Sequence, residues 1–301
     1  MSLAHDDLWP RAGGWPSFVV GERADAAILG VPTWRTSLSP TGAHATPTAI
    51  REALARYSPT LMGPPIVDLD AALRIVDAGD VIEPDGDAGI ERTVARVSEL
   101  AAGTDLVIAL GGDNSLTYPV ARGAGANGLI TIDAHFDLRD GVSNGSPVRR
   151  LVEDAPVDER IDPTRIVQIG IADYANSAAY AQRAADWGIR VITLDELRRR
   201  GIEDVADEAH EIAGGAASAR IHLDVDVDAA DRSAVPGCPA SVPGGLAAFE
   251  LRALVRSLAS GTGVVSADIA EVDATADAPD GRTVRLAALC VLELLAGLAG
   301  R

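Results

Sequence analysis

The sequence has little of what several large classes of protein require. Its 301 residues contain only two cysteines, Cys238 and Cys290, so a disulfide scaffold is excluded and a reducing compartment is expected. Only 4% of the residues are aromatic, so the core must consist mostly of Ala, Val, Leu and Ile.

Basic charge is scarce relative to acidic charge. Lys and Arg together number 26 against 44 Asp and Glu, which gives a formal net charge of −18. Nucleic acids and anionic membranes need a basic face on the protein that binds them. We therefore expect no nucleic acid and no membrane as a partner.

No apolar run is long enough to predict a membrane-spanning helix. The most apolar helical stretch, residues 284–298, is too short to cross a bilayer and contains Glu293. We interpret it as a C-terminal packing helix. The first residues lack the basic-then-apolar pattern of a secretion signal, so a cytoplasmic protein is expected.

Apolar segments of strand length alternate with helical patterns along the whole chain. The expected strands are residues 25–31, 73–78, 105–110, 128–132, 165–170, 190–194, 221–228 and 264–271. The clearest helical patterns are residues 47–57, 88–102, 177–187, 204–213 and 249–259. This alternation predicts an α/β fold with a mostly parallel eight-stranded sheet covered on both faces. No linker divides the chain, so we expect a single domain over residues 1–301.

Three potential metal ligands occupy alternate positions where the fourth strand ends. Asp133, His135 and Asp137 follow the apolar residues 128–132. Because side chains alternate along a strand, all three point to one face. Two carboxylates and an imidazole suit a divalent cation of the Mn, Fe or Zn class. The alternative is a capped strand end with solvated acids.

A second acidic cluster makes the metal interpretation stronger. His222, Asp224, Asp226 and Asp228 share one face of the strand at residues 221–228. Unpaired buried charges are strongly unfavourable, and a cation would neutralise them. Asn114 follows another strand. Ligands of open parallel sheets bind at the carboxyl ends of strands, so all these groups are expected at one site.

The ordered motifs resemble those of the ureohydrolase family, which contains arginases, agmatinases and formimidoylglutamases. Residues 111–115 (GGDNS) resemble the family's GGDHS, and residues 133–137 (DAHFD) match its DAHxD. Residues 226–231 (DVDAAD), followed by PGGL at 243–246, resemble its SxDxDxxDP…PGGL pattern. Residues 266–272 (SADIAEV) resemble its last strand, which ends in a functional Glu.

The resemblance implies a fold and a chemistry. The fold would be a three-layer α/β/α sandwich, and the reaction would be hydrolysis of a C–N bond at a guanidino or imino carbon. Two Mn²⁺ ions would hold a bridging hydroxide, lower the pKa of water and stabilise the tetrahedral intermediate. By this resemblance, Asp133 and Asp226 would bridge the two ions. His135 and Asp228 would complete one metal site, and Asp137 and Asn114 would complete the other. Glu271 would bind the cationic amidine. Asp133, Asp226 and Glu271 are the implied catalytic residues.

Two departures from the family pattern affect the site. Asn114 stands where the family usually has His, and an amide oxygen is a weaker ligand for these metals. The first metal site is therefore expected to bind weakly. Arginases and agmatinases have a His-Gly pair that helps proton transfer, whereas this chain has Asn144-Gly145.

The same region favours one branch of the family. Asp137-Leu138-Arg139, followed by Gly-Ser-Pro, resembles the DAHxDxR…SGTPF pattern of formimidoylglutamases. Their substrate carries two carboxylates, and Arg139 would hold one of them through a bidentate fork. Asn144 and Asn176 would donate further hydrogen bonds to it. The alternative for Arg139 is a surface ion pair with Asp140 or Asp137.

Three other polar residues near the motifs are interpreted as structural. We expect His222 to be a hydrogen-bonded core histidine deep in the sheet. Asp224 stands where the family has Ser, and we favour a hydrogen-bonded supporting acid over a metal ligand. Cys238 is interpreted as a small packing residue, because no neighbouring base would activate it.

These residues leave three possible functions, and the expected partner is a small-molecule substrate. The first is an Mn-dependent formimidoylglutamase that releases formamide and glutamate. The second is an agmatinase or guanidino-acid ureohydrolase that releases urea. The third is a non-catalytic family member with an impaired first metal site. The family also implies a homo-oligomer, either a trimer or a hexamer.

Overall fold

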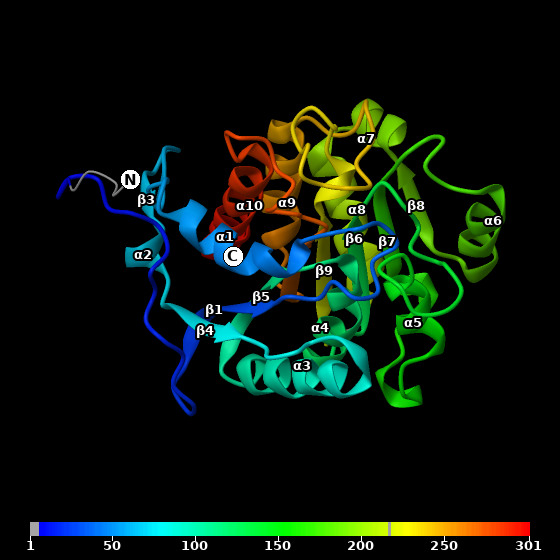
Figure 1. The fold of residues 1–301 in the computed structure, drawn as a ribbon, viewed down its shortest axis with the longest axis horizontal. Helices are drawn as coiled ribbons and strands as arrows, with labels where there is room; N and C mark the ends of the chain where they lie inside the picture. Colours follow the sequence, from blue (N-terminus) through cyan, green and yellow to red (C-terminus); the bar gives the residue numbers. More distant parts are fainter. Residues whose placement is uncertain (1–5, 216–217) are drawn as a thin grey trace.

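The carboxyl ends of eight parallel strands meet at one edge of a single sheet (Figure 1). The computed structural model describes residues 6–215 and 218–301. Across the sheet the strands are β4 (Ile75–Asp80), β1 (Ala24–Val31), β5 (Thr104–Gly111), β10 (Val264–Ala270), β9 (Ile221–Asp226), β6 (Gly128–Ile132), β7 (Ile166–Ile171) and β8 (Arg190–Thr193). Every neighbouring pair is parallel.

Helices cover both faces of the sheet. One face carries α1 (Thr46–Leu54), α7 (Leu194–Arg200), α8 (Ile202–Gly214), α9 (Ala248–Ala259) and α10 (Arg282–Ala299). The other carries α3 (Gly86–Ala101), α4 (Thr117–Gly123), α5 (Pro147–Glu153) and α6 (Ala178–Trp187). A hairpin of β2 (Thr60–Leu61) and β3 (Val67–Asp68) leads into the short α2 (Leu69–Ala72) at one side of the molecule (Figure 1). The predicted three-layer α/β/α architecture is confirmed.

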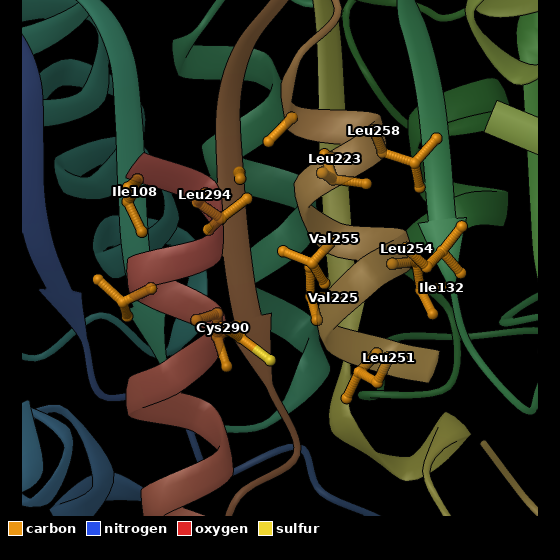
Figure 2. Packing of buried hydrophobic residues seen from close by; sticks show 14 of the residues in the cluster. Ile108, Ile132, Leu223, Val225, Leu251, Leu254, Val255, Leu258, Cys290 and Leu294 are labelled. Atoms are coloured by element: carbon orange, nitrogen blue, oxygen red, sulfur yellow. The ribbon is translucent and has the colours of Figure 1, made fainter. Parts of the chain in front are cut away.

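The larger part of the core lies between the sheet and the layer that contains α9 and α10 (Figure 2). Leu223 and Val225 of β9 face Leu254 and Val255 of α9, and Leu294 of α10 packs nearby. All five side chains are completely buried. Because burying one such aliphatic side chain stabilises a fold by roughly 1.5–3 kcal/mol, this layer holds β9 firmly in the sheet.

All eight predicted strands are present, but some boundaries and helices differ from the prediction. Strand β9 ends at Asp226 because the next residues form a short 3₁₀ turn, Val227–Ala229. Helix α4 was not predicted, because all seven of its residues are buried and it has no polar face to give a periodic signal. Helix α7 was also missed, since it has only seven residues and begins directly after β8.

No described helix has the length and apolar character that a membrane crossing needs. The amino-terminal region, for which no secretion signal is expected, begins in residues outside the described ranges.

Candidate metal centre and active site

Four adjacent strands at the centre of the sheet carry the predicted site residues at their carboxyl ends. Asn114 follows β5, Glu271 follows β10, Asp226 ends β9, and Asp133 follows β6. These strands lie in the order β5, β10, β9, β6, so the four residues meet at one edge. Parallel β/α topology therefore brings together groups that are far apart in the sequence.

Two groups of side chains have the spacing of metal ligands. Asp133, His135 and Asp228 form the first, and Asp133, Asp137 and Asp226 form the second. Within each group, one ligand atom from every residue lies within 4.8 Å of the others. Asp133 belongs to both groups, so its two oxygens can serve two neighbouring ions. This arrangement is compatible with the predicted ligand set.

The electrostatics of these groups favour the binding of a cation. Burial, followed by the charges of Asp137 and Asp228, raises the pKa of Asp133 well above its usual value. Burial likewise raises the pKa of Asp137 to about 7 and that of Asp226 well above normal. Asp133 Oδ2 is buried and has no hydrogen-bond partner among the described residues. A divalent cation would compensate the charge and use this oxygen, so the residues fit the metal that the motifs predict.

His135 and Asp228 form a close pair in the first group. His135 Nδ1 lies 2.7 Å from Asp228 Oδ2 and 3.5 Å from Asp133 Oδ1. Burial alone would lower the pKa of His135, but Asp228 and Asp133 raise it to about 12. Asp228 is buried too, yet the His135 charge and hydrogen bond lower the pKa of its carboxyl. A metal that binds here must therefore displace a proton from the imidazole.

Asn114 lies beside the second group, but its amide oxygen is turned away from it. Its Nδ2 donates to Asp137 Oδ2 at 2.8 Å, and its Oδ1 accepts a hydrogen bond of 2.7 Å from Thr117 Oγ1. An amide ligates a cation through oxygen, so ligation requires a half-turn of this side chain. The Thr117 hydroxyl can accept as well as donate, so it suits either orientation.

The loop that carries the ligands is held by two amide side chains. Gln168 Nε2 donates to Phe136 O at 2.9 Å. Asn176 accepts from Phe136 N at 3.0 Å and donates to Ala134 O at 2.8 Å. These bonds fix the backbone on both sides of His135. Sequence reasoning missed Gln168, although a polar residue in the middle of an otherwise apolar strand is a usable signal.

Asp137 and Glu271 have strained backbones. Their φ angles are +51° and +61°, in the left-handed region that residues other than glycine rarely adopt. Such conformations persist only where the surroundings impose them, and they concentrate at functional sites. Both residues line the same cavity.

Glu271 is held by two hydrogen bonds to one of its oxygens. Its Oε1 accepts from Asn114 N and from Asn144 Nδ2, each at 2.8 Å. Its Oε2 makes no hydrogen bond to a described residue. Burial, and then the charge of Asp113, raises the pKa of Glu271 to about 8, although the bonds from Asn144 and Asn114 oppose this rise.

A cavity of about 230 Å³ opens over these groups. Its lining includes His135, Asp137, Asp226, Asp228, Glu271, Arg139, Asn144 and Asn176, together with Leu38, Gly145, Ser177 and Tyr180. All but two of the predicted site residues thus border one space. Asn114 and Asp133 lie behind the wall, nearly or completely buried.

Arg139 is the exposed cation of this cavity. Its guanidinium makes no ion pair or hydrogen bond within residues 6–215 and 218–301. Asp140, one alternative partner, is paired with Arg183 at 2.8 Å instead. No ion pair of Arg139 with Asp137 is formed either.

The two asparagines predicted to bind substrate have structural partners. Asn144 bonds to Glu271 through Nδ2, and its Oδ1 accepts from Leu38 N at 3.0 Å. The amide of Asn176 is engaged by the backbone of the ligand loop. Both residues line the cavity, and their contact with a substrate stays a prediction.

His222 and Asp224 lie deeper in the sheet. His222 Nε2 is 3.0 Å from Asp268 Oδ2, and its Nδ1 is 2.8 Å from Ser266 Oγ. The completely buried His222 is thus a hydrogen-bonded core residue, as expected. Asp224 is also fully buried, but the hydrogen bonds expected for it are not found: neither of its oxygens has a hydrogen-bond partner among the described residues. Burial and the charge of Asp268 raise its pKa well above normal, and it belongs to neither metal-ligand group.

Cys238 is completely buried beside the acidic cluster. Burial, followed by the charges of Asp228 and Glu271, raises the pKa of its thiol. A thiol that stays protonated is a poor nucleophile, which agrees with a packing role.

Comparisons with known proteins agree with this geometry. The chain is 34% identical over 292 residues to a formimidoylglutamase of Halalkalibacterium halodurans, and the alignment covers 92% of this chain and 88% of the relative. Its structure matches a crystal structure of Bacillus subtilis formimidoylglutamase with a TM-score of 0.88 and 29% identity, over 99% of this chain and 94% of that one. Trypanosoma cruzi formiminoglutamase with Mn²⁺ matches with a TM-score of 0.81 and 26% identity, over 92% and 94% of the two chains. The model of the arginase family matches residues 24–297, so this chain belongs to the arginase family.

Proposed function

We propose that this protein is a manganese-dependent hydrolase that converts N-formimidoyl-glutamate to glutamate and formamide. The observation that carries the proposal is an unpaired guanidinium, that of Arg139, in the same cavity as Glu271 and the carboxylate cluster. An amidine with a carboxylate tail needs both an acidic and a basic contact. Relatives named formimidoylglutamase support this choice.

The metal ligands that we propose are Asn114, Asp133, His135, Asp137, Asp226 and Asp228. Five of them supply carboxylate or imidazole donors, and four carboxylates with one imidazole suit Mn²⁺. When bound, two such ions lower the pKa of water and stabilise negative charge on the substrate. The chain itself keeps the ligands in place through Gln168 and Asn176.

Glu271 is the proposed binding residue for the cationic amidine. The hydrogen bonds to Oε1 from Asn114 N and Asn144 favour the ionised carboxylate. Oε2 is left for the substrate, where a charge-assisted hydrogen bond to an amidinium N–H is strong. In this geometry Asn144 supports Glu271, whereas a histidine at that position would serve proton transfer.

Arg139 is the proposed binding residue for a substrate carboxylate. Arg139 lines the cavity and its guanidinium forms no ion pair with a described residue, so it is available for a bidentate contact. Asn176 is proposed as a further hydrogen-bond donor at this end, although its amide already bonds to the backbone. Agmatine has no carboxylate and would face Arg139 with a second cationic group.

A guanidino-acid ureohydrolase is the second candidate. The same free Arg139 would accept the carboxylate of a guanidino acid, and the same Glu271 would bind its guanidinium. The third candidate, a non-catalytic protein, is disfavoured by the cost of keeping four buried carboxylates together without a use.

Hydrolysis assays with the Mn²⁺-reconstituted protein test the proposal. The substrates are N-formimidoyl-glutamate, 4-guanidinobutyrate, arginine and agmatine, and the products measured are formamide, urea and ammonia. Formamide from the first substrate alone is the expected result. Urea from a guanidino compound would favour the second candidate instead. Turnover that survives Asp226→Asn would contradict the role of the metal cluster.

The family is also the basis for a proposal on the cellular and quaternary context. We propose one catalytic domain over residues 1–301, a cytoplasmic location and a homo-oligomer, either a trimer or a hexamer. The single eight-stranded sheet supports the first of these. Light scattering at several protein concentrations would test the last.

A further inference from the structure

Gly145 lies beneath two side chains of the cavity wall. A methyl group added to Gly145 would lie 2.8 Å from Arg139 Cδ, 3.2 Å from Arg139 Nε and 3.3 Å from Leu38 Cδ1. The stem of Arg139 and the side chain of Leu38 therefore rest against the bare Cα of Gly145. The φ angle of Gly145 is not in the left-handed region, so glycine is needed here for space and not for backbone conformation.

The backbone joins the same two residues. Arg139 N donates to Gly145 O at 3.0 Å. The guanidinium of Arg139 has no ion pair within the described residues, so nothing at the charged end holds the side chain in place. The stem of the side chain, in contrast, lies against Gly145.

The residue before Gly145 bonds to Glu271, another residue of the cavity lining. Asn144 donates to Glu271 Oε1, and its Oδ1 accepts from Leu38 N. Consecutive Cα atoms are about 3.8 Å apart across a trans peptide. The loop therefore links the position of the proposed amidine contact, Glu271, to that of the cation, Arg139.

Hydrogen bonds and burial hold the loop on both sides of Asn144 and Gly145. Ser143 N donates to Ser146 Oγ at 2.9 Å, and Ser146 Oγ donates to Ser143 O at 2.8 Å. Ser146 is completely buried and is followed by Pro147, the first residue of α5. These contacts limit the freedom of the two residues between Ser143 and Ser146.

We propose that Gly145 is a specificity-determining positioning residue, whose missing side chain lets Arg139 meet a substrate carboxylate at a fixed distance from Glu271. The enzyme would then select amidines whose carboxylate lies at that distance from the reacting carbon. This inference rests on the proposed function, because it takes Glu271 and Arg139 as the two ends of the substrate site.

Gly145→Ala tests the inference in the Mn²⁺-loaded enzyme. The added methyl displaces the Arg139 stem, so we expect KM for N-formimidoyl-glutamate to rise about tenfold, the loss of roughly one well-formed charge-assisted contact. We expect kcat to stay within about twofold, and the Mn²⁺ content to equal that of the unmodified protein. Gly214→Ala is the matched control, because nothing lies within 4 Å of the added methyl and no change is expected.

A double-mutant cycle separates positioning of Arg139 from a general disturbance. Arg139→Ala alone should raise KM, and Gly145→Ala should add nothing in that background because the displaced stem is gone. An unchanged KM in Gly145→Ala would overturn the inference. A rise of the same size in the Arg139→Ala background would also overturn it.

Failure of the proposed function can be told apart from failure of this inference. If only 4-guanidinobutyrate is hydrolysed, the proposed function fails, and the same cycle is measured with that carboxylate-bearing substrate. If no substrate turns over, calorimetric titration with glutamate replaces KM. Glutamate binding about tenfold weaker in Gly145→Ala would support the inference, and equal binding would overturn it.

Discussion

Asn144 and Glu271 are joined by a hydrogen bond of 2.8 Å that runs from Asn144 Nδ2 to Glu271 Oε1. The bond links the loop before α5 to the end of β10. By the sequence resemblance, Asn144 stands where arginases and agmatinases have a histidine. The contact favours the ionised form of Glu271.

Asn144→Ala should change the pH dependence of catalysis. Burial raises the pKa of Glu271 to about 8, and the bond from Asn144 counteracts this rise. Removing the bond favours the protonated acid, so the acidic limb of the kcat/KM profile should move to higher pH. At neutral pH, kcat/KM should fall about tenfold. Asn144→Ser, which keeps a hydroxyl donor, should move the limb less, and an unmoved limb in Asn144→Ala would refute the role of the bond.

Asn176→Ala should weaken metal binding as well as any substrate contact. Asn176 makes hydrogen bonds to the backbone on both sides of His135. Without them, buried backbone groups lose their partners, at a cost of about 2 kcal/mol in the free energy of unfolding. Mn²⁺ titration and chemical denaturation would measure both effects. A variant with normal Mn²⁺ affinity and stability but a raised KM would instead assign Asn176 to substrate binding alone.

The metal-free protein should lose stability as the pH rises from 5 to 8. Burial raises the pKa of Asp137 to about 7 and that of Glu271 to about 8, far above the values of these groups in the unfolded chain. Between the two pKa values of each group, the folded state holds a proton that the unfolded state has released. The contribution of that proton to the free energy of unfolding is therefore fully present below the pKa of the unfolded state, and it is lost as the pH rises through the pKa of the folded state. Each such proton contributes a slope of about 1.4 kcal/mol per pH unit within that window.

Added Mn²⁺ should oppose this loss of stability at higher pH. The ion binds deprotonated carboxylates, so the rise in Tm on adding Mn²⁺ should grow between pH 5 and 8. Thermal melts at matched ionic strength, with and without Mn²⁺, would measure it. Asp137→Asn is the informative control, because it removes one titrating group and should flatten the metal-free slope. A metal-free Tm that increases over this range would contradict the assignment.

The fold was predictable from the sequence because apolar segments of strand length recur along the whole chain. Eight apolar segments alternating with helices indicate a parallel sheet, and all eight strands are present. Helix α4 carries no such signal, since it is buried on all sides. The strand ends that carry Asp133, Asp226 and Glu271 were predictable too, because parallel topology gathers them at one edge.

The partners of the site residues were not predictable in the same way. No local pattern indicates that Gln168 holds the backbone at Phe136, or that Asn144 bonds to a glutamate 127 positions away. The free guanidinium of Arg139 was one of two alternatives, and it is distinguished by the pairing of Asp140 with Arg183 and by the lack of an ion pair between Arg139 and Asp137. Such details depend on side-chain orientations at contacts between distant segments.

Asn114→His should raise the affinity of the metal site that contains Asp133, Asp137 and Asp226. In the present arrangement the Asn114 amide nitrogen donates to Asp137 Oδ2, and the oxygen accepts from Thr117. Binding a metal through Asn114 requires the amide to rotate and to give up the bond to Asp137. A neutral imidazole gives a better ligand nitrogen for Mn²⁺, and its other ring N–H can donate to the Thr117 hydroxyl.

The measurement is a Mn²⁺ titration followed by the electron paramagnetic resonance signal of the free ion. Asn114→His should saturate two sites at a free Mn²⁺ concentration at least about tenfold below that of the unmodified protein, since second-sphere and ligand changes commonly alter metal affinity by 10- to 100-fold. Asn114→Ala should shift the weaker site in the opposite direction and leave the tighter one unchanged. If the three proteins titrate alike, residue 114 does not bind the metal, and the ion at this site is held by Asp133, Asp137 and Asp226 alone.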